Sequence, residues 1–215
     1  MTGPITGPQT IEEFRESVLT LKASDEMLAA AVERFGEPDF WQRQPGFATL
    51  VLFILEQQVS LASGRAAFNR LRARIGEVTP ETVLTPTDAE LRADGLSRQK
   101  ARYVRELARS ILEGRIDLAG LESGSDEDVR MELTSLTGIG PWTAEVYLLS
   151  CLRRPDAWPV FDRALQVATA EVLGLEAAPD PAALLEVGER WRPHRSTAAR
   201  IMWHSYLAKR GRTET

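Results

Sequence analysis

Helix-capping signals recur at short intervals along this chain, between apolar residues spaced three and four positions apart. Thr10 with Glu13, and Thr87 with Glu90, each match the pattern of a capping box at a helix start. FATLVLFILEQQ, residues 47–58, places its apolar side chains on one buried helical face. No run alternates apolar and polar residues as a half-buried strand would. The pattern predicts an all-α fold of about eleven short helices joined by tight turns.

Composition excludes several classes of protein. No apolar run reaches the roughly eighteen residues of a membrane span. The segment MTGPITGPQT has neither positive charge nor an apolar stretch, so we expect no signal peptide and a cytoplasmic location, in the bacterial cytosol or nucleoid. Cys151 is the only cysteine and there are two histidines, so we expect no disulfide, no iron–sulfur cluster and no cofactor. The net charge of −5 argues against nucleic acid as a partner, unless basic residues are locally concentrated.

One stretch, LTGIGPWTAEVYLL at 136–149, interrupts the helical pattern. Gly138 and Gly140 permit backbone angles that other residues avoid, and Pro141 suits the first turn of a new helix. The stretch therefore predicts a helix, a tight hairpin and a second helix. Bare glycines at a helix N-terminus let a phosphate approach the backbone N–H groups. A compact turn without a ligand is the alternative interpretation.

This stretch resembles the helix-hairpin-helix of the DNA glycosylase superfamily, in the branch of 3-methyladenine DNA glycosylase II, the AlkA-type enzymes. Three further segments also resemble that family: ILEQQVSLASGRA, LSRQKARYVRELA and RWRPHRSTAARIMW. The resemblance implies two all-α lobes. One lobe combines 1–46 with 158–215, and the other is a six-helix barrel over 47–157 that contains the helix-hairpin-helix at about 126–152. The AlkA-type enzyme also has a β-rich N-terminal domain, and nothing strand-like precedes residue 40, so we expect that domain to be missing.

In the family, a catalytic aspartate lies one helix beyond the hairpin, and AWPVFDRAL places Asp162 at the matching position. Breaking an N-glycosidic bond develops positive charge on the sugar, which a nearby carboxylate stabilises. Whether Asp162 also activates the attacking water stays open. The alternative is that Asp162 only caps the next helix, since aspartate is a favoured N-cap.

Other site residues follow from the same resemblance. Family members that also cut the DNA strand carry a lysine where this chain has Trp142, and an indole cannot form a Schiff base, so we expect no lyase activity. The predicted base pocket consists of Trp142, Trp203 and Tyr147, with Val146 at the position where the family has a tyrosine. Trp41, Trp158 and Trp191 are assigned to the core or to an interface.

Predicted DNA contacts lie in three places. The hairpin residues Gly138, Ile139, Gly140 and Thr143 are expected to hold the DNA backbone, and the family implies Na⁺ or K⁺ at 136–140 when DNA is bound. Gln57 and Gln58 are candidates for filling the gap left by a flipped base, and Gln58 is the better match. Two basic stretches are further candidates whose role stays open: Arg98, Lys100, Arg102 and Arg105, and Arg190, Arg192, Arg195 and Arg200.

Together with these residues, the resemblance implies a monomeric, monofunctional DNA glycosylase that removes alkylated purines from double-stranded DNA in base excision repair. Damaged bases leave the stack most easily, and a cationic base gains about 0.5–2 kcal/mol over an aromatic face. Two alternatives remain: a non-catalytic helix-hairpin-helix DNA-binding protein, and a glycosylase for mismatched or deaminated bases. The sequence does not rank 3-methyladenine, 7-methylguanine, ethenoadenine and hypoxanthine as substrates.

Overall fold

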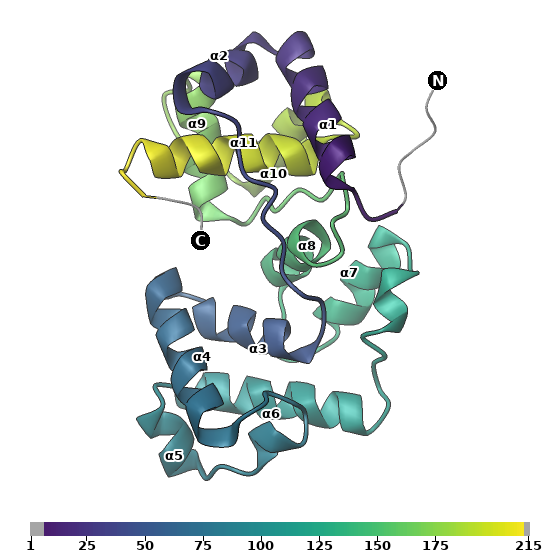
Figure 1. The fold of residues 1–215 in the computed structure, drawn as a ribbon, viewed down its shortest axis with the longest axis vertical. Helices are drawn as coiled ribbons and strands as arrows, with labels where there is room; N and C mark the ends of the chain where they lie inside the picture. The colour runs from purple at the N-terminus through teal and green to yellow at the C-terminus, as the bar shows by residue number, and fades with distance from the viewer. Residues whose placement is uncertain (1–6, 213–215) are drawn as a thin grey trace. The chain divides into compact units, whose positions relative to one another are not determined.

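A computed structural model describes residues 7–212 of the chain, which form eleven α-helices (Figure 1). The helices are α1 Ile11–Ser24, α2 Glu26–Phe35, α3 Phe47–Glu56, α4 Leu61–Ile75, α5 Asp88–Ala93, α6 Arg98–Leu112, α7 Asp126–Thr134, α8 Pro141–Ser150, α9 Arg163–Leu173, α10 Pro181–Gly188 and α11 Arg195–Ala208. Three single 3-10 turns join them: η1 Thr82–Leu84, η2 Gly120–Glu122 and η3 Glu189–Trp191. The described residues contain no strand, so the predicted all-α fold is confirmed.

The capping boxes that the sequence predicts are present. At the start of α1, Glu13 N donates to Thr10 Oγ1 at 3.2 Å, and Thr10 N donates to the Glu13 carboxylate at 2.7 Å. Thr87 and Glu90 exchange the same two bonds at the start of α5. Each box satisfies two backbone donors that a helix start would leave unpaired, which explains why both helices begin where they do.

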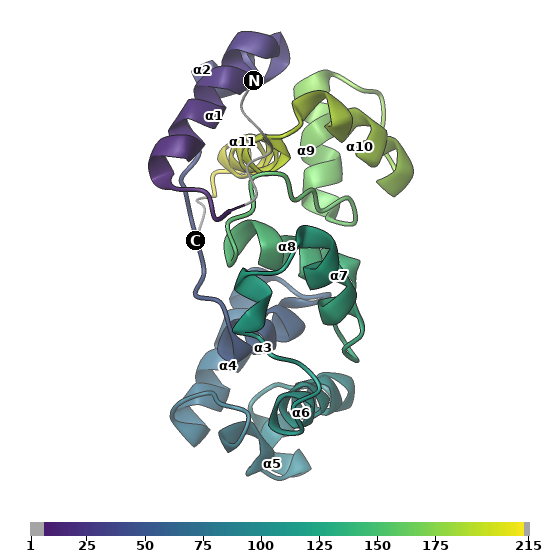
Figure 2. The ribbon, with the colours of Figure 1, turned by 90° about the vertical axis from the view of Figure 1, so that its right-hand side faces the viewer.

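The chain divides into two compact units. Unit 1 combines Met1–Gln42 with Leu148–Thr215, and unit 2 is Arg43–Tyr147. Within unit 1, α11 packs on α9, α2 and α1, and Figure 2 shows it between the α1–α2 pair and the α9–α10 pair. The residues of α11 from 195 to 202 are all buried, because neighbours cover this helix on every side.

Unit 2 is built on α3, which is mostly buried and packs on α4 and α6. At the corner between α3 and α4, Gly64 lies so close to α3 that a Cβ atom would be 2.8 Å from the Cα of Glu56. Only glycine allows this approach. The close packing fixes the short turn 57–60, which carries Gln57 and Gln58.

The predicted lobes ended at residues 46 and 157, whereas the compact units end at Gln42 and Tyr147. The segment 148–157 groups with unit 1, because Ser196 at the start of α11 binds its backbone: Ser196 N donates to Pro155 O, and Ser196 Oγ donates to Arg154 O. The six-helix barrel stays a prediction. No helix among residues 7–212 has the length and apolar character that crossing a membrane requires.

Candidate active site

The hairpin at 136–140 joins α7 to α8 in unit 2, as the sequence predicts. Ile139 N donates to Leu136 O at 3.1 Å, which closes the turn, and Gly138 adopts a φ of +91°. A Cβ atom on Gly138 would also lie 2.3 Å from Cγ of Tyr103 on α6. Gly138 is therefore required both by its backbone angle and by the ring packed against it.

Gly140 has a different role from Gly138. A Cβ atom on Gly140 would meet no other atom within 4 Å, so the space beside its backbone is open. Its carbonyl accepts the N–H of Ala144 at 3.1 Å, the first backbone bond of α8. The hairpin therefore leaves open backbone at the N-terminus of α8, the geometry that binds anions in other proteins.

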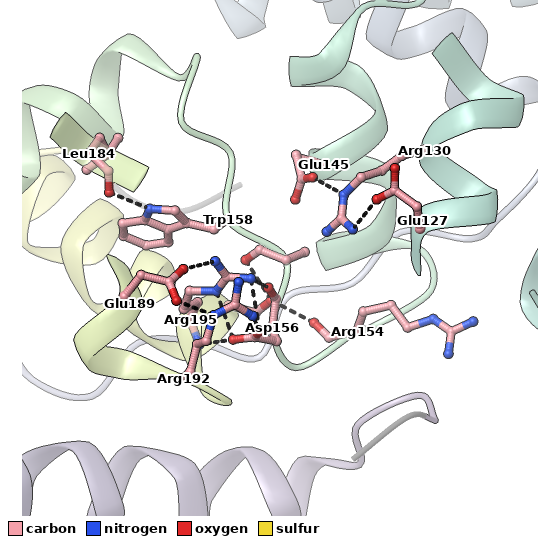
Figure 3. Close-up of polar contacts among 12 residues, drawn as sticks. Glu127, Arg130, Glu145, Arg154, Asp156, Trp158, Leu184, Glu189, Arg192 and Arg195 are labelled. Atoms are coloured by element: carbon pink, nitrogen blue, oxygen red, sulfur yellow. Dashed lines mark hydrogen bonds and ion pairs between the residues drawn. The ribbon is translucent and has the colours of Figure 1, made fainter. Parts of the chain in front are cut away.

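The two helices of the motif are held together by an ion pair. Arg130 on α7 binds the carboxylate of Glu145 on α8, and it also faces Glu127 one turn earlier on α7 (Figure 3). The exposed fraction of the Glu145 side chain is 12%, so this contact is partly shielded from water. It links the two helices on either side of the hairpin.

Gln57 contacts the hairpin directly. Its Nε2 donates to Gly138 O at 2.9 Å and to Thr143 Oγ1 at 3.3 Å, so the amide supports two of the residues predicted to hold DNA. Gln58 is exposed and has a φ of +57°. Of the two glutamines, Gln58 is thus the one that extends from the protein. The role of both in filling a gap in DNA stays a prediction.

Lys100, from the first basic stretch, has a structural role here. Its Nζ donates to Leu55 O, near the C-terminus of α3, at 2.7 Å. Burial lowers the pKa of Lys100, because the charged form loses water. The ammonium group therefore stabilises the end of α3, from which the turn with Gln57 and Gln58 begins.

Two predicted pocket residues lie on α8. The half-buried Trp142 packs edge-on against Phe53 of α3, with ring centroids 6.4 Å apart and planes at 71°. The hydroxyl of Tyr147 accepts a hydrogen bond from Gly46 N at 2.9 Å, which ties α8 to the start of α3. Their contact with a base stays a prediction.

Asp162 lies in unit 1, immediately before α9, and is half-buried. Its Oδ1 accepts two hydrogen bonds: one from Leu165 N at 2.7 Å, the other from the indole Nε1 of Trp203 at 3.1 Å. The first bond confirms that Asp162 caps the helix. The second places Trp203, on α11, beside the carboxylate. The cap does not exclude catalysis, since it holds the carboxylate in a fixed orientation.

Trp41, which the sequence analysis assigned to the core or to an interface, is half-buried and also belongs to this part of unit 1. Its ring lies 5.9 Å from that of Trp203, tilted by 44°. The buried guanidinium of Arg200 stacks 4.4 Å from the centre of the Trp41 ring and donates to Trp41 O at 2.7 Å. The available signal was an aromatic pair, FW at 40–41, inside the Gly/Pro-containing segment GEPDFWQRQPG.

The segment that leads to Asp162 is fixed by α11, a feature that sequence reasoning did not find. The guanidinium of Arg195 binds both carboxylate oxygens of Asp156 at 2.9 Å, and Arg192 binds the same carboxylate (Figure 3). Trp158 is buried and its Nε1 donates to Leu184 O on α10. Trp158 and the buried Trp191 are core residues, one of the two roles that the sequence left open for them.

Three arginines of the second basic stretch bind partners within unit 1. Arg195 and Arg200 are buried, with exposed fractions of 5% and 1%, and their guanidinium groups bind partners within unit 1. Arg190 forms an ion pair with Asp25. These three side chains hold unit 1 together. Within residues 7–212, no cluster of histidine, cysteine, aspartate and glutamate has the arrangement of a metal site.

Comparison with known proteins identifies the family. Residues 51–193 match the model of the "HhH-GPD superfamily base excision DNA repair protein". The Bacillus subtilis protein YfjP is 31% identical over 160 residues, which cover 71% of this chain and 56% of YfjP. The chain thus spans little more than half of YfjP, and 39% of a Bacillus subtilis DNA-3-methyladenine glycosylase that it also matches.

Two solved structures are similar over most of the chain. A DNA-3-methyladenine glycosidase from Bacillus halodurans has a TM-score of 0.76 and 30% identity, over 88% of both chains. The Schizosaccharomyces pombe 3-methyladenine DNA glycosylase Mag1, solved with abasic DNA, has a TM-score of 0.80 and 26% identity, over 87% of this chain and 95% of Mag1. From the match to more than half of its length, this chain belongs to the HhH-GPD superfamily of base excision DNA repair proteins.

Proposed function

We propose that this chain is a monofunctional DNA glycosylase that hydrolyses the N-glycosidic bond of alkylated purines, of the 3-methyladenine type, in base excision repair. The observation that carries the proposal is the half-buried carboxylate of Asp162, oriented by a backbone N–H and by the indole of Trp203. Family membership and the names of the similar glycosylases support the reaction class.

The chemistry needs a negative charge beside the sugar as its bond to the base breaks. The transition state resembles an oxocarbenium ion, and a preoriented carboxylate stabilises it without reorganising at the moment of reaction. In this proposal Asp162 supplies that carboxylate. The indole of Trp203 contacts the carboxylate, and the ring of Trp41 lies 5.9 Å from that of Trp203. In the proposal these two rings give a cationic purine an aromatic face.

The product of this reaction is an abasic site in an intact strand. Strand cleavage by a glycosylase requires an amine that attacks the sugar and forms a Schiff base. Trp142 takes the place of that amine at the start of α8, and its ring packs on Phe53. We therefore expect base release without lyase activity.

The partner in this proposal is double-stranded DNA with a damaged base, bound by a monomer. The open backbone at Gly140 suits a phosphate, and the exposed Gln58 suits the gap that a flipped base leaves. A monovalent cation at 136–140 and the absence of a required cofactor remain part of the proposal.

One assay on three substrates separates the proposal from its alternatives. A methylated duplex, a mismatched duplex and a deaminated duplex are each incubated with the protein; free bases are measured by chromatography and strand length by denaturing gel. We expect release of methylated purines, with strands that break only after alkali. DNA binding without base release would support the non-catalytic alternative. Release only from the mismatched or deaminated duplexes would support a glycosylase for such bases.

A further inference from the structure

Unit 2 contains a cavity of about 280 Å³ between α5 and α6, and none of the residues assigned above to base release lines it. Five arginines and one carboxylate line it: Arg92, Arg98, Arg102, Arg105, Arg109 and Asp88. We refer to this cavity as the arginine groove. The whole chain has a net charge of −5, so a concentration of positive charge here does not follow from composition.

Four of these arginines form a stripe along one face of α6. Positions 98, 102, 105 and 109 are three or four residues apart, and residues at this spacing lie above one another on a helix. The stripe extends for about 16 Å along the helix axis, given a rise of about 1.5 Å per residue. It is therefore a line of charge, longer than any single phosphate or carboxylate.

The positive charge of the arginine groove is only partly neutralised by the protein. Asp88 pairs with Arg105, and Glu106 pairs with Arg109. Arg92, Arg98 and Arg102 have no carboxylate partner in the described chain from 7 to 212. The Arg102 guanidinium lies 5.4 Å over the ring of Tyr103, a contact that leaves its charge without a counter-ion. The positive charge of these three arginines therefore remains available to a ligand.

The arrangement is unfavourable for an isolated helix. Like charges three or four residues apart destabilise a helix, and the stripe contains consecutive pairs of this kind. Arg98 also lies in the first turn of α6, where the helix dipole favours acidic residues and where α6 has none. A bound polyanion would reverse both effects, because it would lie against every member of the stripe.

We propose that the arginine groove binds a chain of linked phosphate groups. Guanidinium groups bind phosphate oxygens in a bidentate manner, and a row of them matches a linear polyphosphate better than a single ion. The phosphates come either from free polyphosphate or from consecutive positions of a DNA backbone. Only the DNA source rests on the proposed function.

The test compares two double variants that remove the same charge. Arg98→Gln with Arg102→Gln removes two groove arginines without a carboxylate partner. Arg15→Gln with Arg72→Gln removes two exposed arginines on α1 and α4. Calorimetry at low salt measures binding of tripolyphosphate and of an undamaged duplex to each protein. Thermal unfolding without ligand shows that each variant is folded.

We expect wild type and control to bind tripolyphosphate alike, and the groove variant to bind it about tenfold or more weakly. The groove variant without ligand should unfold at the same temperature as wild type or higher, because repulsion is relieved. An equal loss of duplex affinity would identify the DNA backbone as the source; unchanged duplex affinity would identify free polyphosphate. Equal affinities of groove variant and control for both ligands would overturn the proposal. The tripolyphosphate result does not depend on base release, so the two proposals fail separately.

Discussion

Two loops of unit 1 end in an aspartate that caps the next helix, but the contacts that hold the two loops differ. Asp162 ends the loop before α9, and its Oδ1 accepts Leu165 N at 2.7 Å. Asp180 ends the loop before α10, and its Oδ1 accepts Ala183 N at 2.9 Å. As helix caps the two are equivalent. The cap therefore does not distinguish a catalytic aspartate from a structural one.

The surroundings of the two caps distinguish them. The loop before α9 is held by Arg195 at Asp156, by Ser196 at its backbone, and by a bond from Gln166 Nε2 to Val160 O. The indole of Trp203 then fixes the carboxylate itself. The loop 174–180 is mostly exposed. The catalytic role proposed for Asp162 needs contacts that keep the orientation of its carboxylate, and the first loop supplies them.

The largest expected effect comes from replacing each aspartate by asparagine, which tests whether the two caps differ in function. Asparagine caps a helix as well as aspartate but carries no charge. We expect Asp162→Asn to slow release of methylated purines by on the order of 10²- to 10³-fold, the size seen when one electrostatic stabiliser is removed. Asp180→Asn should release bases at the wild-type rate. Equal losses in both variants would mean that the distinction is wrong.

Asp156→Ala should weaken the support of the first loop. Arg195 has a side chain that is only 6% exposed, and it would lose both oxygens of Asp156 and keep one contact at 3.3 Å to Glu189, which is 53% exposed. We expect the free energy of unfolding to fall by about 3 kcal/mol, measured by urea denaturation. Arg192→Ala is the matched control: this arginine binds the same carboxylate but is 48% exposed, and should cost less than about 1 kcal/mol. A larger loss of stability in Arg192→Ala than in Asp156→Ala would show that Arg195 does not hold the loop.

Asp180→Ala should affect stability alone. Loss of the cap removes the acceptor for Ala183 N, and we expect a decrease of about 1 kcal/mol in the free energy of unfolding. Base release measured at a temperature well below unfolding should stay at the wild-type rate. A marked loss of release by the folded variant would assign a functional role to the second loop as well.

Trp203→Phe should slow base release, but much less than Asp162→Asn does. The aromatic ring beside Trp41 is kept, but the donor to Asp162 is lost while Leu165 N remains. We expect base release to slow by about two- to tenfold, as for the loss of one hydrogen bond. An unchanged rate would show that the indole N–H does not help to orient the carboxylate.

Local patterns predicted the helices, the capping boxes and the hairpin, because each depends on residues three or four positions apart. Asp162 was predicted as a site residue from its family motif, and its capping bond was predicted from its position before a helix. The contacts that surround it were not predictable in this way. Trp203 is 41 residues from Asp162, and Arg200 is 159 residues from Trp41. Such pairs meet only through packing of the helices, and no local spacing specifies them.

Gln57 illustrates the same limit in unit 2. As the residue after α3 it has the pattern of an exposed helix end, and the family resemblance suggested a contact with DNA. The structure shows its amide bound to Gly138 O, 81 residues away. Gly138 itself was predicted from its backbone angle, whereas the ring of Tyr103 packed against it was not.

The most direct test of the central claim is a single-turnover measurement on a preformed complex. Wild type and Asp162→Asn are each mixed in excess with a duplex that carries one methylated purine. Binding is followed by fluorescence anisotropy, and base release by quenching at timed intervals. The claim that the charge of Asp162 drives bond cleavage predicts that the variant binds the duplex as tightly as wild type, or more tightly, and releases the base at least about 100-fold more slowly. Equal rates of release from fully bound DNA would contradict it.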